Sequence, residues 1–280
     1  MEVITKINEM RAKVLSVKDR KKSIGFVPTM GAIHDGHISL MRSARSENDE
    51  LIVSIFLNPT QFDKGEDFDN YPRQLNQDIE LIRKENVDVI FSPGTEEMYP
   101  DGYCTNVRQD RITDALCGRV RPGHFNGVTT IVTKLFNIIK PDRAYFGQKD
   151  YQQSAVIERL VRDLNMDIDI QVCPTVREED GLALSSRNKR LNLEERQNAL
   201  SIYGSLLKAR SMFASNIRDA KEIIEEMTSV VKKVKQARID YISIVNADTL
   251  EDLSFINGRA LAAVAVWIGN TRLIDNTILE

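Results

Sequence analysis

Residues 24–47 read IGFVPTMGAIHDGHISLMRSARSE, and this stretch decides the fold expected for the first half of the chain. It opens with an apolar run, Ile24–Val27, which predicts a buried strand, and it closes with a segment of helical spacing, Ile38–Glu47. Between the two lies a glycine-bearing turn that contains His34 and His37. The order of strand, tight turn and helix start is typical of a parallel α/β sheet.

The same alternation continues on both sides of this unit. Helical spacing from Val3 to Val17 predicts an opening helix, and the apolar run Leu51–Leu57 predicts a strand that is buried on both faces. Further strands are predicted at Val87–Phe91, Arg143–Phe146 and Ile168–Val172, and further helices at Leu75–Ile82, Val128–Ile139 and Tyr151–Leu164. We therefore expect a doubly wound parallel α/β sheet over residues 1–175, with ligands bound beyond the carboxyl ends of its strands.

The pattern changes after Pro174. Asn192 is a predicted N-cap with two acidic residues in the turn that follows it. Two helices are predicted, over residues 193–213 and 223–234, followed by strands at Ile239–Val245, Ala260–Ile268 and Arg272–Leu279. Helices followed by strands predict a second, smaller α+β domain over residues 176–280.

Composition excludes several classes of partner. The net charge is −3, and no basic stripe runs through the chain, so we expect no nucleic acid. The longest apolar run, Ala260–Ile268, is too short to span a bilayer, so we expect no membrane partner. The three cysteines contain no Cys-x-x-Cys pair, which argues against zinc and a disulfide framework and favours a reducing cytoplasm.

The histidine cluster carries the first sign of chemistry. The unpaired N–H groups and the positive dipole end of a helix N-terminus attract phosphate. Histidines three residues apart at such a start, as His34 and His37 are, lie on the same side of the first turn and can donate to phosphate oxygens. Such donors stabilise charge that develops in phosphoryl or adenylyl transfer. Because Gly31 and Gly36 also let the backbone approach a ligand, the pattern favours a nucleotide enzyme over a plain polar turn.

Four further loops follow predicted strands or lie at the domain junction, and each taken alone also fits a solvated turn. Amides suit a small polar substrate, whereas lysine, arginine and hydroxyl groups suit carboxylate or phosphate. The candidates in these loops are Asn58, Gln61, Arg121, Lys149, Gln153 and Ser185–Arg187. Together with the histidine cluster, they predict a site for a nucleotide and a small polar substrate.

Together these motifs resemble those of the pantoate–β-alanine ligase family, and the resemblance covers the length of the chain. The His-x-Gly-His element alone belongs to a wider nucleotidylyltransferase superfamily that includes class I aminoacyl-tRNA synthetases, whereas the full set is specific to this ligase family. The segments that carry it are Val27–His37, Asn58–Phe62, Tyr71–Arg73, Arg121–Phe125, Tyr145–Asp150, Gln152–Gln153 and Ser185–Asn188.

The resemblance implies a Rossmann-like N-terminal domain (1–175) that binds ATP and pantoate, and a smaller α+β domain (176–280) that closes over ATP. It implies a ligase that condenses pantoate with β-alanine to pantothenate, a coenzyme A precursor, through pantoyl adenylate, with release of AMP and pyrophosphate. Mg²⁺ accompanies ATP in the family, whose members are cytoplasmic and usually homodimeric. The acidic stretch Asp63–Asp69 is interpreted as a loop that could shield the adenylate from water.

The resemblance also implies roles for residues at matching positions. His34, His37 and Lys149 are expected to be catalytic, with His37 also a proton donor. Gln61 and Gln153 are expected to bind pantoate, and Gln61 also borders the β-alanine site. The ATP contacts that the resemblance implies are Met30, Gly31, Ala32, Ile33, His34, Asp35, Gly36, His37, Gly147, Gln148, Lys149, Asp150, Val176, Leu184, Ser185, Ser186 and Arg187. No residue is assigned as a metal ligand.

Two positions depart from the family pattern, and three other functions stay open. Gln148 stands where glutamate or lysine is commoner, and Arg190 stands where tyrosine is frequent. A metal-dependent hydrolase would use His34, His37 and His124, but no recognisable acidic ligand accompanies the histidine pair. A nucleotide sensor would have a degraded site. Another His-x-Gly-His adenylyltransferase would lack the paired glutamines and would transfer AMP to a phosphate.

Overall fold

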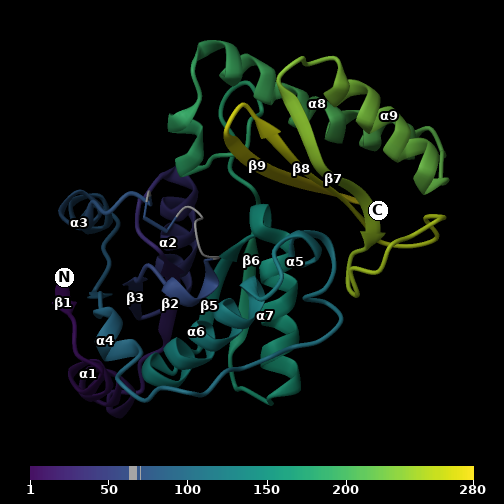
Figure 1. The fold of residues 1–280 in the computed structure, drawn as a ribbon. Coiled ribbons are helices and arrows are strands. Elements are labelled where there is room, and N and C mark those ends of the chain that lie inside the picture. Colours follow the sequence, from purple (N-terminus) through teal and green to yellow (C-terminus); the bar gives the residue numbers. More distant parts are fainter. Residues whose placement is uncertain (63–67, 70) are drawn as a thin grey trace. The chain divides into compact units, whose positions relative to one another are not determined.

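The computed structural model describes residues 1–62, 68–69 and 71–280, and the chain divides into two compact units (Figure 1). Unit 1 comprises Met1–Asp110, Arg121–Gln148 and Gln153–Pro174. Unit 2 comprises Arg111–Val120, Lys149–Gln152 and Thr175–Glu280. Unit 2 therefore takes two short segments from the first part of the chain in addition to the C-terminal residues. Residues 63–67 of the predicted shielding loop lie outside the described residues.

Unit 1 is built on a six-stranded parallel sheet with the order β1-β4-β3-β2-β5-β6. The predicted doubly wound parallel sheet is thereby confirmed. Its central strands read as nearly continuous apolar runs because helices cover both faces. The strands are β1 (Glu2–Ile4), β2 (Ile24–Thr29), β3 (Glu50–Ile55), β4 (Val89–Phe91), β5 (Arg143–Gly147) and β6 (Asp169–Cys173).

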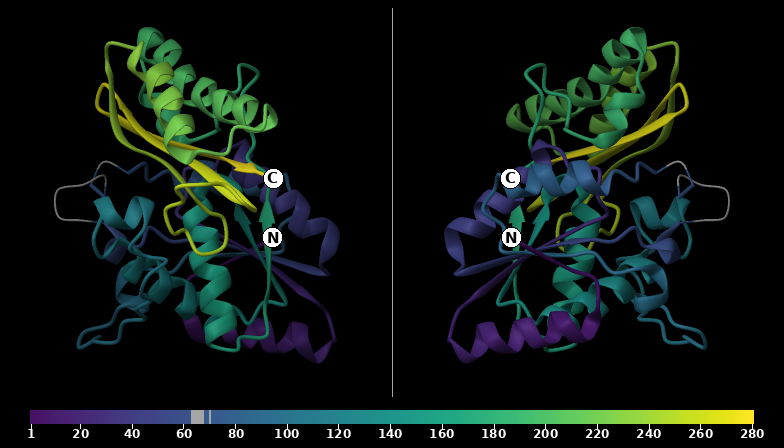
Figure 2. Two further views of the ribbon diagram at one scale, coloured as in Figure 1. Left: turned by 90° about the vertical axis from the view of Figure 1, so that its right-hand side faces the viewer. Right: turned by 90° about the vertical axis from the view of Figure 1, so that its left-hand side faces the viewer.

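Alternate side chains of β2 face opposite layers of helices. Phe26 packs edge-on against Phe136 of α6, and α6 contacts α1. Val27 belongs instead to a core cluster with Met41 of α2 and Ile82 of α3. The sheet is thus covered by α1 and α6 on one face and by α2 and α3 on the other (Figure 2). The helices are α1 (Ile7–Asp19), α2 (Asp35–Glu47), α3 (Leu75–Arg83), α4 (Thr95–Met98), α6 (His124–Ile139) and α7 (Tyr151–Asp163).

The prediction of one helix from Val3 to Val17 is wrong at its start. Val3 lies in β1 and pairs with Ile90 of β4, and the helix begins only at Ile7. A three-residue edge strand shows no period of its own, and the spacing from Val3 to Ile7 also fits a helix. Two other helices of unit 1 begin earlier than predicted: α2 at Asp35 and α6 at His124.

Unit 2 contains a three-stranded antiparallel sheet, β7-β8-β9, with α8 and α9 packed against it (Figure 1). The predicted small α+β fold is confirmed, and Asn192 caps α8 in a capping box with Glu195. Alanine and valine alternate over residues 263–266 of β8, a strand whose residues are almost all buried. The elements are α5 (Leu116–Val120), α8 (Leu193–Ala214), α9 (Ala220–Lys232), β7 (Ala237–Asn246), β8 (Ala260–Ile268) and β9 (Thr271–Leu279).

Among the described residues, three short 3₁₀ helices fall in the loops that carry candidate site residues: η1 (Pro59–Gln61), η2 (Gln148–Asp150) and η3 (Ser186–Arg190). Within the described part of the chain, no helix has the length and apolar character needed to cross a membrane.

A buried tyrosine ties the C-terminal end of α2 to the sheet of unit 1. Tyr145 of β5 is 1% exposed, and its phenol donates to Glu47 Oε2 at 2.7 Å. The phenol oxygen in turn accepts from Asn48 Nδ2 at 2.7 Å. Burial raises the pKa of the Tyr145 phenol, and the hydrogen bond to Glu47 raises it further. The contacts fix α2 at the end opposite its histidines.

Replacing Tyr145 with phenylalanine should lower the free energy of unfolding by about 1–3 kcal/mol, because two buried or half-buried groups lose their partner. The measurement is urea unfolding followed by circular dichroism at pH 7. Tyr103→Phe is the matched control, because the Tyr103 phenol has no hydrogen bond among the described residues. Equal losses in the two variants would contradict the role of the Tyr145 phenol.

The same variant should show the pH dependence of this contact. An unfolded tyrosine releases its proton near pH 10, about the ordinary pKa, whereas folded Tyr145 keeps its proton to higher pH. The stabilisation is therefore complete below about pH 10 and is lost as the pH rises further. The stability difference between wild type and Tyr145→Phe should shrink between pH 8 and pH 11. A constant difference would contradict the raised pKa.

Candidate active site

The loops of the predicted site in unit 1 begin at one edge of its sheet. Strands β3, β2 and β5 are neighbours and run parallel, so their carboxyl ends lie together. Thr29, at the end of β2, pairs with Ile55, at the end of β3. The loop after β2 leads to the histidines, and the loop after β3 leads to Gln61. Parallel pairing thus brings together segments that are distant in sequence, as ligand sites of such sheets require.

The two histidines stack at the start of α2. His34 is the N-cap residue and His37 lies in the first turn, with 4.1 Å between their ring centroids and an interplanar angle of 34°. The predicted placement on one side of the first turn is confirmed. His34 Nδ1 accepts a hydrogen bond from Gly36 N at 3.1 Å. In the neutral ring the proton is therefore on Nε2, which makes Nε2–H a donor beside the helix N-terminus.

Gly36 is required by the His34 ring. A Cβ atom at position 36 would lie 2.8 Å from His34 Cε1 and 2.9 Å from His34 Nδ1, which is closer than a carbon can approach. Glycine therefore lets the His34 ring fold back over the first turn and accept from the backbone. Gly36 is predicted to let a ligand approach the backbone closely. In the structure, it is the His34 side chain that approaches the Gly36 backbone.

Gln61 is held from several sides within unit 1. It is buried in η1, where its Oε1 accepts from Asn58 Nδ2 at 3.0 Å and its Nε2 lies 3.1 Å from Met30 Sδ. Asn58 also accepts from the Tyr99 phenol at 2.8 Å. The Gln61 amide is thus oriented by groups from the β2, β3 and α4 regions. Sequence reasoning placed Asn58 with the possible ligand contacts, whereas here it orients Gln61.

The N-terminus of α6 closes around the backbone of Gln61. His124 Nδ1 donates to Gln61 O at 2.7 Å, and Arg121 Nη2 lies 3.5 Å from the same oxygen. A Cβ atom at Gly127 would lie 2.4 Å from Thr60 O, so only glycine permits this packing. His124 therefore supports η1, which argues against a three-histidine metal site. In the described part of the chain, no three or more His, Cys, Asp or Glu residues form a group that could hold a metal.

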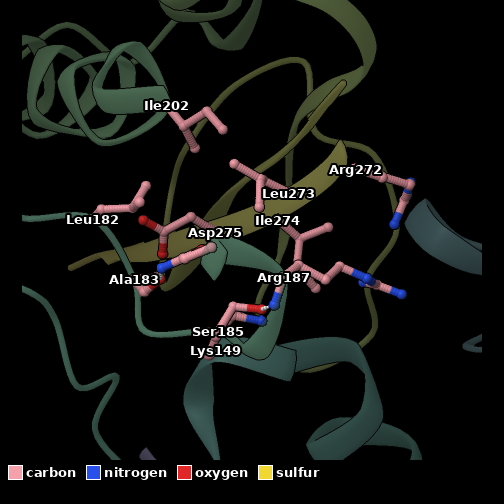
Figure 3. Close-up of a pocket in the computed structure, with 11 residues that line it drawn as sticks. Lys149, Leu182, Ala183, Ser185, Arg187, Ile202, Arg272, Leu273, Ile274 and Asp275 are labelled. Carbon is pink, nitrogen blue, oxygen red and sulfur yellow. Dashed lines mark hydrogen bonds between the residues drawn. The ribbon is translucent and has the colours of Figure 1, made fainter. Parts of the chain in front are cut away.

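A pocket in unit 2 gathers the predicted phosphate-binding residues of that unit (Figure 3). Lys149, Ser185 and Arg187 line it, together with Arg272 and Asp275 of β9. Figure 3 shows Leu273, Ile274 and Asp275 along β9, with Lys149, Ser185 and Arg187 below this strand in the view. The Lys149 backbone is fixed because its carbonyl accepts from Asn276 Nδ2 at 2.9 Å.

The charge balance of this pocket favours an anion. Its lining contains three cationic side chains and one carboxylate, Asp275. Asp275 is neutralised by Arg177, which donates to its two oxygens at 2.6 and 3.0 Å. Arg272 also pairs with Asp240 at 2.8 Å, while Lys149 lies 3.8 Å from Asp150. Lys149 and Arg187 thus add positive charge to a lining that suits phosphate.

A short backbone hairpin positions Ser185 and Arg187. Leu184 N donates to Val176 O at 3.0 Å, and Gly181, with φ +95°, turns the chain between them. The predicted contacts Val176 and Leu184 are therefore paired neighbours. Ser185 caps η3 and accepts from Arg187 N at 3.3 Å. Ser185 and Arg187, the hydroxyl and guanidinium candidates, therefore lie at the start of η3.

The two glutamines at the start of α7 differ in role. Gln152 is buried and bonds to three backbone groups: its Nε2 donates to Ile112 O and Ala115 O, and its Oε1 accepts from Cys117 N. It therefore fixes the segment before α5 and supplies no free amide. Gln153, the predicted pantoate residue, is half-buried in α7 of unit 1.

Comparison with known proteins decides the family. A sequence profile of the family described as pantoate-beta-alanine ligase matches residues 2–278. The chain belongs to the pantoate–β-alanine ligase family. The resemblance seen in the motifs is thereby confirmed, as is the reaction, an ATP-dependent ligation that forms pantothenate. Another His-x-Gly-His adenylyltransferase is excluded by the full-length match.

Relatives and solved structures of this ligase family match along their whole length. The chain is 54% identical over 279 residues to the pantothenate synthetase of Thermotoga petrophila, with 100% of both chains covered. The pantothenate synthetase crystal structure from Thermus thermophilus has a TM-score of 0.94, with 44% identity and 99% of each chain covered. The pantoate-beta-alanine ligase of Francisella tularensis, solved with beta-gamma ATP and beta-alanine, has a TM-score of 0.81, with 40% identity and 99% and 97% coverage.

Several residues of the candidate site were not found from the sequence. Arg177, Arg272, Asp275 and Asn276 frame the unit 2 pocket, and Tyr99 orients Asn58. They lie in strands, a loop and a helix cap whose local sequence contains no glycine-rich turn or paired motif. Only their contacts across the fold reveal them.

Replacing Gly36 with alanine should reduce kcat for pantothenate formation by on the order of 100-fold, because the added Cβ displaces the His34 ring. The measurement is steady-state kinetics with the melting temperature recorded in parallel. Gly94→Ala is the matched control, because Gly94 also precedes a helix but a Cβ there meets nothing within 4 Å. Full kcat in Gly36→Ala would show that the His34 geometry is not needed.

Replacing Arg177 with alanine should destabilise unit 2 by about 3–5 kcal/mol, because it leaves the buried Asp275 carboxylate without its cation. The double variant Arg177→Met/Asp275→Leu should recover much of this loss, since no buried charge is left unpaired. Urea unfolding of both variants measures the difference. A double variant as unstable as Arg177→Ala would contradict the argument from charge.

Proposed function

We propose that this ligase works through pantoyl adenylate and that the stacked histidines at the N-terminus of α2 stabilise its formation. In the first step a pantoate carboxylate oxygen forms a bond to the α-phosphorus of ATP, and the bond from that phosphorus to the pyrophosphate oxygen breaks. Negative charge grows on the phosphoryl oxygens as this happens. The observation that carries the proposal is the pair of stacked rings at the start of α2, in which His34 Nδ1 accepts from Gly36 N.

Each histidine has a defined part in this step. Because His34 Nδ1 already accepts from Gly36 N, the ring can donate from Nε2 without carrying a charge. His37 lies in the first turn of α2, where the helix dipole adds to the attraction for phosphoryl oxygens. His37 is assigned the additional role of proton donor. Both groups are held before the substrate arrives, so little reorganisation is needed in the transition state.

In the second step the β-alanine amine forms a bond to the acyl carbon, the bond from that carbon to the AMP oxygen breaks, and the amine releases a proton. We assign pantoate binding to Gln61 and Gln153, with Gln61 also bordering β-alanine. The fixed orientation of the Gln61 amide supports this role, because it presents one donor group and one acceptor group in a buried site. Arg121 lies beside Gln61 and suits the carboxylate of a substrate.

We infer the ATP contacts of each unit from the family resemblance. The unit 1 contacts are the loop from Met30 to His37 together with Gly147 and Gln148, and unit 2 contributes Lys149, Asp150, Val176 and Leu184–Arg187. The cationic pocket of unit 2 supports this assignment, because Lys149 and Arg187 suit phosphate oxygens. Lys149 is assigned a catalytic role in stabilising phosphoryl charge. From the resemblance, the N-terminal domain (1–175) would bind ATP and pantoate, and the C-terminal domain (176–280) would close over ATP.

Mg²⁺ fits this site as an ion carried by ATP. Mg²⁺ in nucleotide enzymes is held by phosphate oxygens, waters and one or two carboxylates. In the described residues no cluster of acidic or histidine ligands forms a protein cage, and Asp150, beside Lys149, is a carboxylate near the proposed phosphates. When bound, the ion would neutralise phosphate charge.

A cytoplasmic homodimer is the assembly and location that we propose from the family resemblance. The three free cysteines, Cys104, Cys117 and Cys173, agree with a reducing compartment. The oligomeric state can be read directly from sedimentation velocity of the purified chain.

The adenylate mechanism predicts where the oxygen of pantoate goes. With ¹⁸O in the pantoate carboxylate, one labelled oxygen should appear in AMP, because the acyl–oxygen bond breaks in the second step. Without β-alanine, pantoate should also promote exchange of labelled pyrophosphate into ATP. His37→Ala should lower both rates by on the order of 100-fold or more. Mass spectrometry of AMP and the exchange assay supply the measurements.

Two results would overturn the proposal. Release of ADP and labelled inorganic phosphate would indicate an acyl phosphate instead of an adenylate. Wild-type rates in His37→Ala would remove the histidine pair from the mechanism while the ligase activity itself remained.

A further inference from the structure

A buried carboxylate lies directly behind the histidine loop. Asp78, in the first turn of α3, is 1% exposed. Its Oδ2 accepts from Ala32 N at 2.9 Å, and its Oδ1 accepts from Ile33 N at 2.9 Å. Gln74 Nε2 also donates to Oδ1 at 3.2 Å. Among the described residues Asp78 has no cationic partner, so backbone and amide N–H groups compensate its buried charge.

The loop that Asp78 binds has an unusual backbone. Gly31 and Ala32 both have positive φ, +86° and +53°. This conformation costs energy at Ala32, because left-handed backbone is unfavourable for residues with a Cβ. It also turns two successive N–H groups toward one point, which creates a concave anion-binding site. The Asp78 carboxylate occupies that site from within the protein.

The hydrogen bonds to Asp78 reduce the number of backbone N–H donors with which this loop could bind a nucleotide. Ala32 N and Ile33 N point to Asp78 and are not available to ATP. ATP contacts at these two positions would therefore come from other atoms. The His34 and His37 rings lie at the start of α2, directly after this loop. Asp78 thus acts on the loop from behind, and we assign it no contact with substrate.

The position of the histidine pair depends on this loop. Ile33 directly precedes His34, whose carbonyl accepts from Ile38 N in the first turn of α2. Holding the Ile33 backbone therefore sets where His34 enters the helix, and the His34 ring stacks on His37. Gly31 is equally confined, since a Cβ there would lie 3.0 Å from Asp78 Oδ2 and 3.3 Å from Ile55 Cγ2.

We propose that Asp78 is a positioning residue for catalysis: its buried carboxylate holds the left-handed Gly31–Ile33 loop and thereby places His34 and His37. The inference rests on the proposed role of the histidines in adenylate formation. It assigns a function to a carboxylate on a different helix from the histidines, 41 residues beyond His37 in the sequence. A change at Asp78 should act mainly on the chemical step, through the histidines.

The test is a double-mutant cycle between Asp78→Asn and His37→Ala. Asparagine keeps the size of the side chain but turns one acceptor into a donor, which cannot accept from a backbone N–H. We expect Asp78→Asn to lower kcat by on the order of 100-fold while the KM for β-alanine changes little. In the His37→Ala background the same substitution should cost much less, because its effect passes through the missing ring.

Asp88→Asn is the matched control. Asp88 also accepts from a backbone N–H, Leu51 N at 2.8 Å, but it lies at the amino end of β4, away from the histidine loop. It should lower the melting temperature without lowering kcat. If Asp78→Asn fails to fold, Asp78→Ser, which keeps one acceptor, enters the same cycle.

The outcomes separate this inference from the mechanism on which it rests. A smaller kcat loss in the His37→Ala background supports the positioning role. Equal fold losses in both backgrounds, or a full kcat in Asp78→Asn, would overturn it and leave Asp78 with a role in stability alone. Full activity of His37→Ala by itself would instead contradict the proposed histidine mechanism.

Discussion

The parallel hydrogen bonding of β2 with β3 and β5 is the interaction on which the site in unit 1 depends. Parallel pairing obliges every strand to return through a crossover, so the loops after successive strands emerge at one edge. The histidine turn and the η1 turn with Gln61 meet at that edge, although they are separated by a full helix and strand. A different strand order would place these loops apart, whatever their sequences.

The placement of these loops at one edge of the sheet does not by itself fix the geometry of their side chains. Buried polar contacts fix the remaining positions. Tyr145 ties the last turn of α2 to β5, while Asp78 fixes the loop that enters the first turn. Asn58 and the His124 ring hold Gln61 through its side chain and backbone, respectively. Every one of these contacts lies in a buried or half-buried place, where an unpaired polar group is costly. These contacts hold the candidate groups in place within unit 1, as the proposed stabilisation of a developing charge requires.

Unit 2 gathers cationic side chains around its pocket, and ion pairs compensate the charges that are buried there. Its pocket contains a buried carboxylate, Asp275, whose charge is cancelled by two hydrogen bonds from Arg177. Arg272 is held by Asp240 in the same way. Structural pairs thus satisfy the inner charges, and Lys149 and Arg187 line the pocket with charge that suits a polyanion. The proposed ATP contacts Lys149 and Arg187 thus lie beside inner charges that are already paired.

The sequence by itself determined most strands and helices, the fold class of both units and the family, because these depend on hydrophobic period, caps and local motifs. It also determined that His34 and His37 share one side of a helix start, since a spacing of three sets that geometry. Strand β1, at the edge of the sheet, was not predicted from the sequence, because three residues show no hydrophobic period. The sequence also did not reveal the roles of Asp78, Asn276 and the Arg177–Asp275 pair. These roles arise from contacts between segments that are distant in the sequence. Only the tertiary structure decided which carboxylate would occupy the N–H groups behind the histidine loop, because such pairing depends on where α3 packs against the sheet.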